Sequence, residues 1–305
     1  MQNLALFYNP VAGFAGFADK LDRIVYLCQE QGLQVVPFRI RNGEYIQRTM
    51  REISGQPWHS IVAAGGDGTL HQVVNAMLQS GIEVPLALFP EGTTNDVANY
   101  LHIPRDEEDY CRMLTRGQLL SVDVGKIGNQ YFINSASAGF ITETAHEVDY
   151  NMKNLLGRVA YFLKGLEKIP KLRELNMTVQ DDAGRNYEEE ILFFMILNGG
   201  IAGGFRHLPF QGAMSDGYLD LLALKRPRLS NIPQMLLKWQ NGQLVNDESI
   251  FYCRAKSFMI DLQPNSSTDL DGERGPQLPW KVEVCPKKLL FRVPEGEDMG
   301  EEWQK

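Results

Sequence analysis

The sequence contains few cysteines and no long apolar stretch. Its four cysteines, Cys28, Cys111, Cys253 and Cys285, are scattered over 305 residues and form no Cys-x-x-Cys pair. This pattern argues against a disulfide framework and favours buried free thiols in a reducing cytoplasm. No run of about 18 or more apolar residues occurs, so we expect no transmembrane helix. Residues 1–4 also lack the basic region and apolar core of a signal peptide.

An excess of positive charge is absent as well. Lysine and arginine total 30 against 38 aspartates and glutamates, so the net charge is −8 and the pI is about 5.3. We therefore expect no nucleic-acid partner, because such partners attract basic surfaces. Neither Gly-x4-Gly-Lys-Ser/Thr nor Gly-x-Gly-x-x-Gly occurs, and the protein-kinase phrases are missing. These absences argue against a P-loop NTPase, a dinucleotide-binding fingerprint and a protein kinase.

Two glycine–aspartate phrases carry the strongest positive signal. Residues 65–69 read Gly-Gly-Asp-Gly-Thr and residues 92–96 read Gly-Thr-Thr-Asn-Asp. Each follows a short apolar run, at 61–64 and 86–89, and precedes a segment that can be helical. Glycine lets the backbone approach a ligand closely, while the N–H groups and dipole of a helix start favour an anion. The two turns predict a site for a nucleotide and its metal ion, which indicates phosphoryl transfer.

The pattern of the chain changes near residue 121. Before it, strand and helix patterns alternate, which is typical of a mostly parallel sheet with helices on both faces and ligands at the carboxyl ends of its strands. After it, turn signals separate strand-like segments at 121–127, 130–137, 174–180, 188–197, 218–224, 250–262 and 280–292. We expect an N-terminal doubly wound α/β nucleotide domain and a C-terminal antiparallel β-sandwich domain. The latter has a helical insertion near 142–170 and a helix near 230–240.

One segment does not fit a pure β domain. Residues 155–166 form a broad apolar stripe, and basic residues surround it between 151 and 173, Lys164 among them. A basic amphipathic helix in an acidic protein can lie against anionic lipid headgroups. The commoner alternative is a core helix with lysines on its solvent side. Both interpretations stay open.

Several short phrases occur in a characteristic order along the chain. They are Asn9-Pro10-x-x-Gly13, Gly65-Gly66-Asp67-Gly68-Thr69, Gly92-Thr93-x-Asn95-Asp96-x-Ala98, Asp216-Gly217-x-Leu219-Asp220 and Asp271-Gly272-Glu273. Together they resemble the diacylglycerol kinase catalytic family, in particular its soluble bacterial lipid kinases, which are similar to sphingosine kinases and more distantly to NAD kinases. The resemblance implies an α/β ATP-binding domain at 1–122 and 287–305, a β-sandwich lipid-binding domain at 123–286, and a cleft between them.

The resemblance also assigns roles to single residues. It implies an ATP site formed by Asn9, Pro10, Val11, Ala12, Gly13, Arg41, Gly65, Gly66, Asp67, Gly68, Thr69, Leu70, His71, Gln72, Thr93 and Asn95. Asp67 and Asp96 would organise the catalytic Mg²⁺, partly through water. A second, structural cation is expected on the Asp216 carboxylate and the carbonyl groups of Ala213 and Tyr218. A plain Asp-Gly turn is the alternative there.

The Asp271-Gly272-Glu273 phrase supplies the general base in this resemblance. A lipid hydroxyl is a poor nucleophile, so a carboxylate must take its proton as the O–P bond forms. We favour Glu273 for this role and keep Asp271 as a rival or as a member of the metal network. Without the resemblance, the phrase is an ordinary surface turn.

Three positions depart from the family pattern. Members often carry a basic residue where this chain has Phe14, many have a glutamate in place of Gln72, and a basic residue often replaces Asn99. Lost positive charge near a triphosphate weakens the electrostatic stabilisation of the transition state. Because of these departures, one alternative stays open: the protein is a regulator that binds a nucleotide or a lipid without catalysing a reaction.

We therefore predict an ATP- and Mg²⁺-dependent lipid kinase of phospholipid metabolism, a transferase that converts diacylglycerol into phosphatidic acid. We expect it in the cytoplasm, where it meets its lipid substrate as a peripheral protein at the membrane surface. A homodimer is compatible with the sequence. The second alternative is a kinase of a soluble substrate such as NAD.

Overall fold

The structure is a computed structural model that describes residues 2–13, 16–139, 174–199, 213–227, 229–231 and 246–296, with residues 234 and 238. The chain divides into two compact units. The first unit comprises residues 1–124, 129–133 and 286–305, and the second comprises 125–128 and 134–285. The expectations on Phe14, Lys164, the segment 142–170 and most of 230–240 lie outside the described residues.

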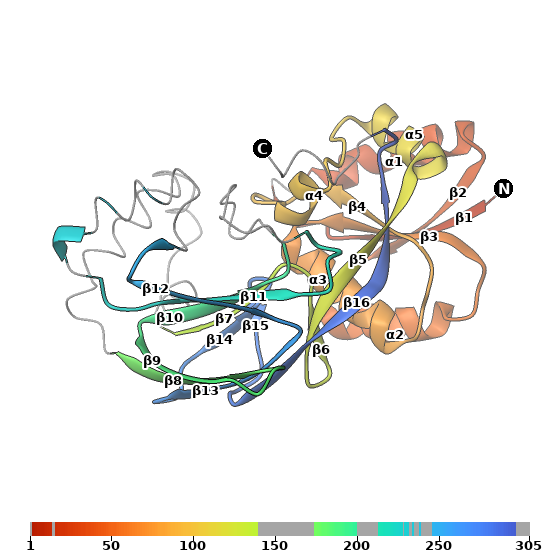
Figure 1. Ribbon diagram of the computed structural model, residues 1–305. Helices are drawn as coiled ribbons and strands as arrows, with labels where there is room; N and C mark the ends of the chain where they lie inside the picture. Colours follow the sequence, from red (N-terminus) through yellow and green to blue (C-terminus); the bar gives the residue numbers. More distant parts are fainter. Residues whose placement is uncertain are drawn as a thin grey trace. The chain divides into compact units, whose positions relative to one another are not determined.

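The first unit alternates strands and helices (Figure 1). Its strands include β1 (Gln2–Tyr8), β2 (Leu33–Arg39), β3 (Trp58–Gly65), β4 (Leu86–Pro90) and β6 (Gln130–Phe132). Its helices are α1 (Phe17–Glu30), α2 (Gly43–Ile53), α3 (Asp67–Gln79), α4 (Asp96–Tyr100) and α5 (Glu107–Arg116). β1 pairs in parallel with β2 and β3, and β3 pairs in parallel with β4. α1 packs with α5 on one face of this sheet and α2 packs with α3 on the other. The predicted doubly wound α/β arrangement is confirmed.

Burial explains why these segments take their structures. The central strands have continuous apolar runs, as in parallel sheets that helices cover on both faces, and residues 61–64 of β3 are at most 3% exposed. In α3, Leu70, Val73, Val74 and Met77 recur at helical spacing and are buried. Side chains fix two of the helix starts: Asn42 caps α2 by accepting from the Tyr45 N–H, and Asp106 caps α5.

The second unit is built from antiparallel strands. They are β7 (Ser135–Gly139), β8 (Leu175–Asp181), β9 (Asn186–Ile191), β10 (Phe193–Leu197), β11 (Leu219–Leu224), β12 (Ile250–Ala255), β13 (Ser257–Gln263), β14 (Thr268–Leu270) and β15 (Glu273–Arg274). One sheet has the order β12-β11-β10-β7-β14-β15, and β8 pairs with β9 and β13 in a second one. The rings of Phe194 and Trp280 meet edge to face at 5.7 Å between the two sheets. The predicted antiparallel β architecture is confirmed.

Two long strands have residues in both units. β5 (Gln118–Ile127) pairs with β6 and β16, and β16 (Trp280–Val293) is the last strand of the described chain. Residues 280–283 of β16 pair with β13 of the second unit. Phe291 of β16 pairs in parallel with Leu86 of β4 in the first unit. A short 3₁₀ turn, Leu229–Asn231, is the part of the predicted helix near 230–240 that the structure describes. Among the described helices, none has both the length and the apolar character that a membrane span requires.

Candidate functional site

Three turns of the first unit lie at the same edge of its sheet. Residues 9–13 follow the carboxyl end of β1, residues 66–69 follow that of β3, and residues 91–96 follow that of β4. Because these strands are parallel neighbours, their carboxyl ends meet at one edge, where ligands of such sheets bind. Phrases that lie far apart in the sequence are therefore brought together by the topology of the sheet.

Glycine contacts show how closely the turns approach. A Cβ atom on Gly92 would lie 2.5 Å from Gly66 Cα, so two backbones pass in direct contact. Gly13 has φ +55, and a Cβ there would overlap the backbone oxygen of Glu91. A residue with a side chain fits neither position without displacing the backbone. Glycine is thus required where the three turns converge.

Polar side chains tie the turns internally and to one another. Asn9 donates from Nδ2 to Thr69 Oγ1 at 3.3 Å, and its Oδ1 accepts from the Val11 N–H at 3.1 Å. Asn95 has φ +50, and its side chain both accepts from the Gly92 N–H at 2.8 Å and donates to the Gly92 carbonyl at 2.6 Å. Asn tolerates this left-handed conformation better than most residues. Asn9 and Asn95, predicted as nucleotide ligands, also build the turns.

The start of α3 has the features of an anion site. Gly66 is its N-cap and, having no side chain, makes no side-chain cap bond to the first N–H groups of this 13-residue helix. Such groups carry partial positive charge and are available to phosphate oxygens. Asp67 is the first residue of α3, and Asp96 is the first residue of α4 and only 5% exposed. Two carboxylates therefore lie at helix starts next to the glycine turns.

The donor chemistry of these aspartates suits a divalent cation. Mg²⁺ prefers oxygen ligands and commonly binds through one or two carboxylates, with phosphate and water oxygens completing its shell. Within the described ranges, no group of three or more His, Cys, Asp or Glu side chains forms a complete metal site. Asp67 and Asp96 thus fit a metal ion that arrives with phosphate groups.

Sequence reasoning missed one ion pair at this edge. Lys20 of α1 contacts Glu91 with Nζ 2.7 Å from Oε1, and the Glu91 side chain is only 11% exposed. The Lys20 ammonium also lies 5.7 Å from the centre of the Phe89 ring. Glu91 immediately precedes the second glycine phrase, but no sequence pattern identifies its partner 71 residues away. The pair connects α1 to the turn after β4.

The remaining predicted nucleotide residues differ in their surroundings. Leu70 is 1% exposed and belongs to the core, so only its backbone is available to a ligand. His71 is also buried, with Nε2 3.4 Å from Asn75 Nδ2 on the same helix. The Arg41 guanidinium stacks over the Tyr45 ring at 5.4 Å. Val11, in contrast, is 77% exposed in the first turn, where an incoming ligand can reach it.

Of the three departures, the structure describes Gln72 and Asn99. Asn99 donates to the Thr94 carbonyl at 2.8 Å, and its Oδ1 accepts from Arg105 at 3.3 Å. Arg105 therefore places a positive charge beside the position that lacks one. The Gln72 amide lies near the start of α2, where a Cβ on Gly43 would be 3.7 Å from its Oε1. Although the side chain of residue 99 is uncharged, Arg105 supplies a positive charge in this part of the unit.

The second unit holds the Asp271-Gly272-Glu273 phrase in a tight hairpin between β14 and β15. Asp271 and Gly272 have φ values of +52 and +91, as the two central residues of a type I′ turn require. The Asp271 Oδ1 accepts from the N–H groups of Asn134 at 2.8 Å and Ser135 at 2.9 Å. Asp271 is thus bound to the start of β7, whereas Glu273 is partly exposed on β15. The Asp-Gly dipeptide is a sequence signal for such a hairpin.

The Asp216 loop of the second unit is satisfied by N–H donors. Asp216 Oδ2 accepts from the Ala213 N–H at 2.8 Å and from Arg254 Nη2 at 2.6 Å, and Oδ1 accepts from the Tyr218 N–H at 2.9 Å. The Ala213 carbonyl accepts from the Asp216 N–H at 3.2 Å. Of the groups that were predicted to hold a structural cation, the Asp216 carboxylate and the Ala213 carbonyl are therefore engaged with the protein itself.

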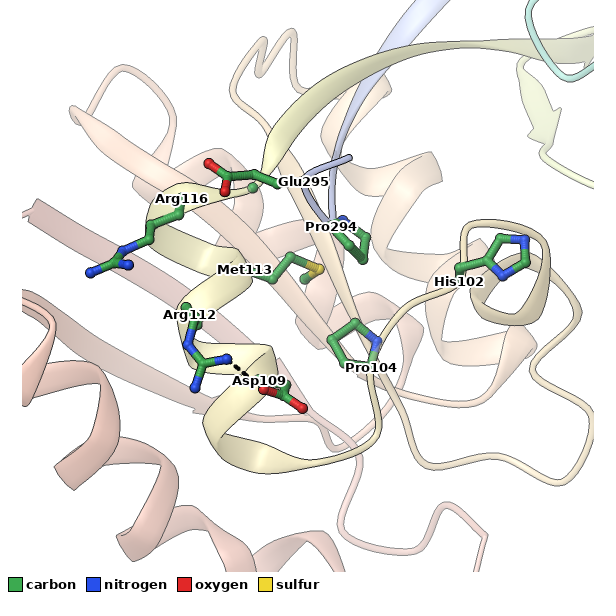
Figure 2. Close-up of a pocket in the computed structure, with 9 residues that line it drawn as sticks. His102, Pro104, Asp109, Arg112, Met113, Arg116, Pro294 and Glu295 are labelled. Atoms are coloured by element: carbon green, nitrogen blue, oxygen red, sulfur yellow. Dashed lines mark hydrogen bonds and ion pairs between the residues drawn. The ribbon is translucent and has the colours of Figure 1, made fainter. Parts of the chain in front are cut away.

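A cavity of about 370 Å³ lies elsewhere in the first unit (Figure 2). Its lining comprises His102, Pro104, Asp109, Arg112, Met113, Arg116, Gly117, Pro294 and Glu295. On α5, Arg112 Nη1 lies 2.7 Å from Asp109 Oδ1, so the lining of the cavity includes both positive and negative side chains. None of the predicted site residues lines it.

The contact between Gly66 and Gly92 can be tested by Gly92→Ala. The sequence predicts that these turns bind ATP, and on that prediction we expect the substitution to weaken ATP binding by roughly tenfold or more, because relieving an overlap in packed backbone costs about 1–3 kcal/mol. Calorimetric titration with ATP measures the change. Gly16→Ala is the matched control, since a Cβ on Gly16 would have no atom within 4 Å. Equal affinities in the two variants would contradict the close approach of the turns.

An α/β unit that gathers glycine turns at the carboxyl edge of a parallel sheet is typical of proteins that bind phosphate groups. Comparison with known proteins defines the family. Residues 3–127 match the diacylglycerol kinase catalytic domain, and residues 134–292 match the YegS C-terminal NAD kinase beta sandwich-like domain. The chain belongs to the diacylglycerol kinase family.

Individual relatives cover nearly the whole chain. A diacylglycerol kinase of Bacillus subtilis (strain 168) is 31% identical over 282 residues, 92% of each chain. One of Staphylococcus carnosus (strain TM300) is 28% identical over 274 residues, 90% of this chain and 89% of the relative. A solved structure of a diacylglycerol kinase from Bacillus anthracis str. Sterne superposes with a TM-score of 0.78 at 23% identity, covering 96% of this chain and 98% of that one. The last comparison concerns the fold alone.

Proposed function

We propose that this protein transfers the γ-phosphoryl group of ATP to the free hydroxyl of diacylglycerol and so forms phosphatidic acid. The observation that carries the proposal is the convergence of the three glycine turns at one edge of a parallel sheet, next to Asp67 and Asp96. The family membership of the chain supports the lipid as acceptor, since the relatives are named for diacylglycerol.

The first unit is proposed to bind the nucleotide. The turn after β1 and the start of α3 would hold the phosphates by backbone N–H groups, and Thr93 lies exposed in the turn after β4. Asp67 and Asp96 would hold Mg²⁺, which neutralises charge on the transferred phosphoryl group. Lys20, through its pair with Glu91, keeps the turn after β4 in place.

The second unit is proposed to act on the lipid hydroxyl. The hydroxyl oxygen attacks the γ-phosphorus, the bond from that phosphorus to the bridging oxygen of ADP breaks, and Glu273 takes the hydroxyl proton. Asp271 holds the hairpin through its bonds to Asn134 and Ser135, which supports Glu273 as the base and Asp271 as a positioning residue. With both acceptor bonds directed to backbone N–H groups, Oδ1 of Asp271 is poorly placed to take a proton.

Acting on diacylglycerol requires contact with a membrane surface. We therefore propose peripheral attachment at the cytoplasmic face, with residues 1–122 and 287–305 serving ATP and residues 123–286 serving the lipid. Sedimentation with vesicles that contain diacylglycerol tests this attachment. Equal recovery in the supernatant with and without the lipid would contradict it.

The reaction itself is tested with γ-labelled ATP, Mg²⁺ and a panel of acceptors. Diacylglycerol, monoacylglycerol, ceramide and sphingosine are presented in mixed micelles, and NAD is presented in solution. We expect label in phosphatidic acid at a rate at least roughly tenfold above that with any other acceptor, a selectivity of about 1.4 kcal/mol. Label on NAD would show a kinase of a soluble substrate. ATP binding without transfer to any acceptor would show a quiet regulator instead.

A further inference from the structure

The Asp216 carboxylate already has three hydrogen-bond donors from the protein around it. Ca²⁺ and Mg²⁺ bind six or more oxygen atoms, whose lone pairs must point at the ion. Here the described contacts of the Asp216 carboxylate are the N–H groups of Ala213 and Tyr218 and the guanidinium of Arg254. These three donors point hydrogen atoms at the carboxylate and take up most of its four acceptor positions, so the carboxylate is poorly suited to a metal ion.

Arg254 is held in this position by the register of two strands. It lies directly opposite Asp220 in the pairing of β11 with β12, so both side chains project from the same face. Its Nε is 3.9 Å from Asp220 Oδ1, which also accepts from the Tyr252 hydroxyl at 2.6 Å. The guanidinium stacks over the Tyr218 ring at 4.9 Å. One arginine thus contacts the loop, the neighbouring strand and an aromatic ring.

Two carboxylates of this cluster lie beside one guanidinium. Asp220 is 1% exposed, and its burial raises the pKa of the carboxyl group, while the Tyr252 hydroxyl and Arg254 act in the opposite direction. Asp216 is the second carboxylate on the same guanidinium, with 22% of its side chain exposed. Arginine suits the position because its planar group is always charged and can serve two carboxylates while stacking on a ring.

We propose that Arg254 is the built-in cation of the Asp216 loop and replaces a bound divalent ion there. The guanidinium joins the loop to β11 by pairing with both Asp216 and Asp220 and offsetting part of their negative charge, so the fold of the second unit does not depend on a metal. This inference concerns the structure of the second unit and is independent of which substrate the protein phosphorylates.

The test compares thermal unfolding in EDTA with unfolding in millimolar Ca²⁺. For the unmodified protein we expect the same midpoint in both. In Arg254→Met, the two carboxylates lose their cation, and we expect the midpoint in EDTA to fall by roughly 5 °C and to recover in Ca²⁺. Lys256→Met is the matched control, because Lys256 lies over the same Tyr218 ring at 5.4 Å. It should unfold at one midpoint under both conditions.

A second measurement covers the case in which Arg254→Met fails to fold. Tb³⁺ bound at the loop would be excited through the Tyr218 ring and would luminesce. We expect the unmodified protein and Asp216→Asn to give the same signal, because neither binds Tb³⁺ at this loop. A signal that the unmodified protein loses on Asp216→Asn would overturn the proposal, as would an Arg254→Met variant that folds with the same midpoint in EDTA and in Ca²⁺.

Discussion

Asp67→Asn is expected to lower the turnover number by about 10³-fold, the scale at which a single charged group in phosphoryl transfer acts. Asp67 opens α3 beside the Gly66–Gly92 contact, where the proposed metal ion would meet the phosphates. An Asn side chain keeps the shape and can remain at a helix start, but it lacks the charge that binds a divalent cation. Rates measured at several Mg²⁺ concentrations should show partial recovery at the higher ones, because mass action offsets weaker binding of the cation.

Binding of ATP without Mg²⁺ separates this role from a structural one. A carboxylate beside phosphate groups repels them when no cation is present, so Asp67→Asn should bind metal-free ATP at least as tightly as the unmodified protein does. Asp106→Asn is the matched control, because Asp106 also lies at a helix start and accepts from the N–H groups of Glu108 and Asp109. It should retain turnover. Full turnover in Asp67→Asn would refute a catalytic metal at this residue.

The glycine phrases made the convergence of the turns at one edge of the sheet predictable from sequence. Residues 65–69 and 92–96 each follow an apolar run, and sequential strands of a parallel sheet are often neighbours, so the turns after β3 and β4 were expected at one edge. The glycines themselves indicate that backbones approach closely, and the contact between Gly66 and Gly92 is such an approach. Local chemistry and simple topology were sufficient for this part.

Ion pairs between residues far apart in the chain could not be predicted from the sequence. Lys20 and Glu91 are 71 residues apart, and Arg254 and Asp216 are 38 apart. The first pair depends on how α1 packs beside the sheet, and the second depends on the register of β11 with β12. A shift of that register by one residue would move Arg254 to the other face. Such contacts follow from tertiary packing, so the structure was needed to find the cation on the Asp216 loop.

Glu273→Gln is expected to lower the turnover number by about 10²- to 10⁴-fold, the usual contribution of a general base. Glutamine has nearly the same size and cannot take the proton of the lipid hydroxyl. Because Glu273 is partly exposed on a two-residue strand, its replacement should leave the midpoint of thermal unfolding unchanged. Initial rates with diacylglycerol micelles and a thermal scan of the same preparation measure both quantities.

Asp271→Asn gives the comparison that decides between the two carboxylates. Asn tolerates the left-handed conformation that Asp271 adopts, with φ +52, but its amide oxygen accepts more weakly from the Asn134 and Ser135 N–H groups. Hydrogen bonds to a charged group contribute about 1.5–3 kcal/mol, so we expect this variant to unfold several degrees earlier and to lose less than roughly tenfold in turnover. If Asp271 were the base, Asp271→Asn would lower turnover by about 10²-fold or more as well as lowering the midpoint, and Glu273→Gln would remain active. A general base must be held in place and must still reach the substrate. The two hydrogen bonds of Asp271 hold the hairpin that carries Glu273, so they keep Glu273 in place.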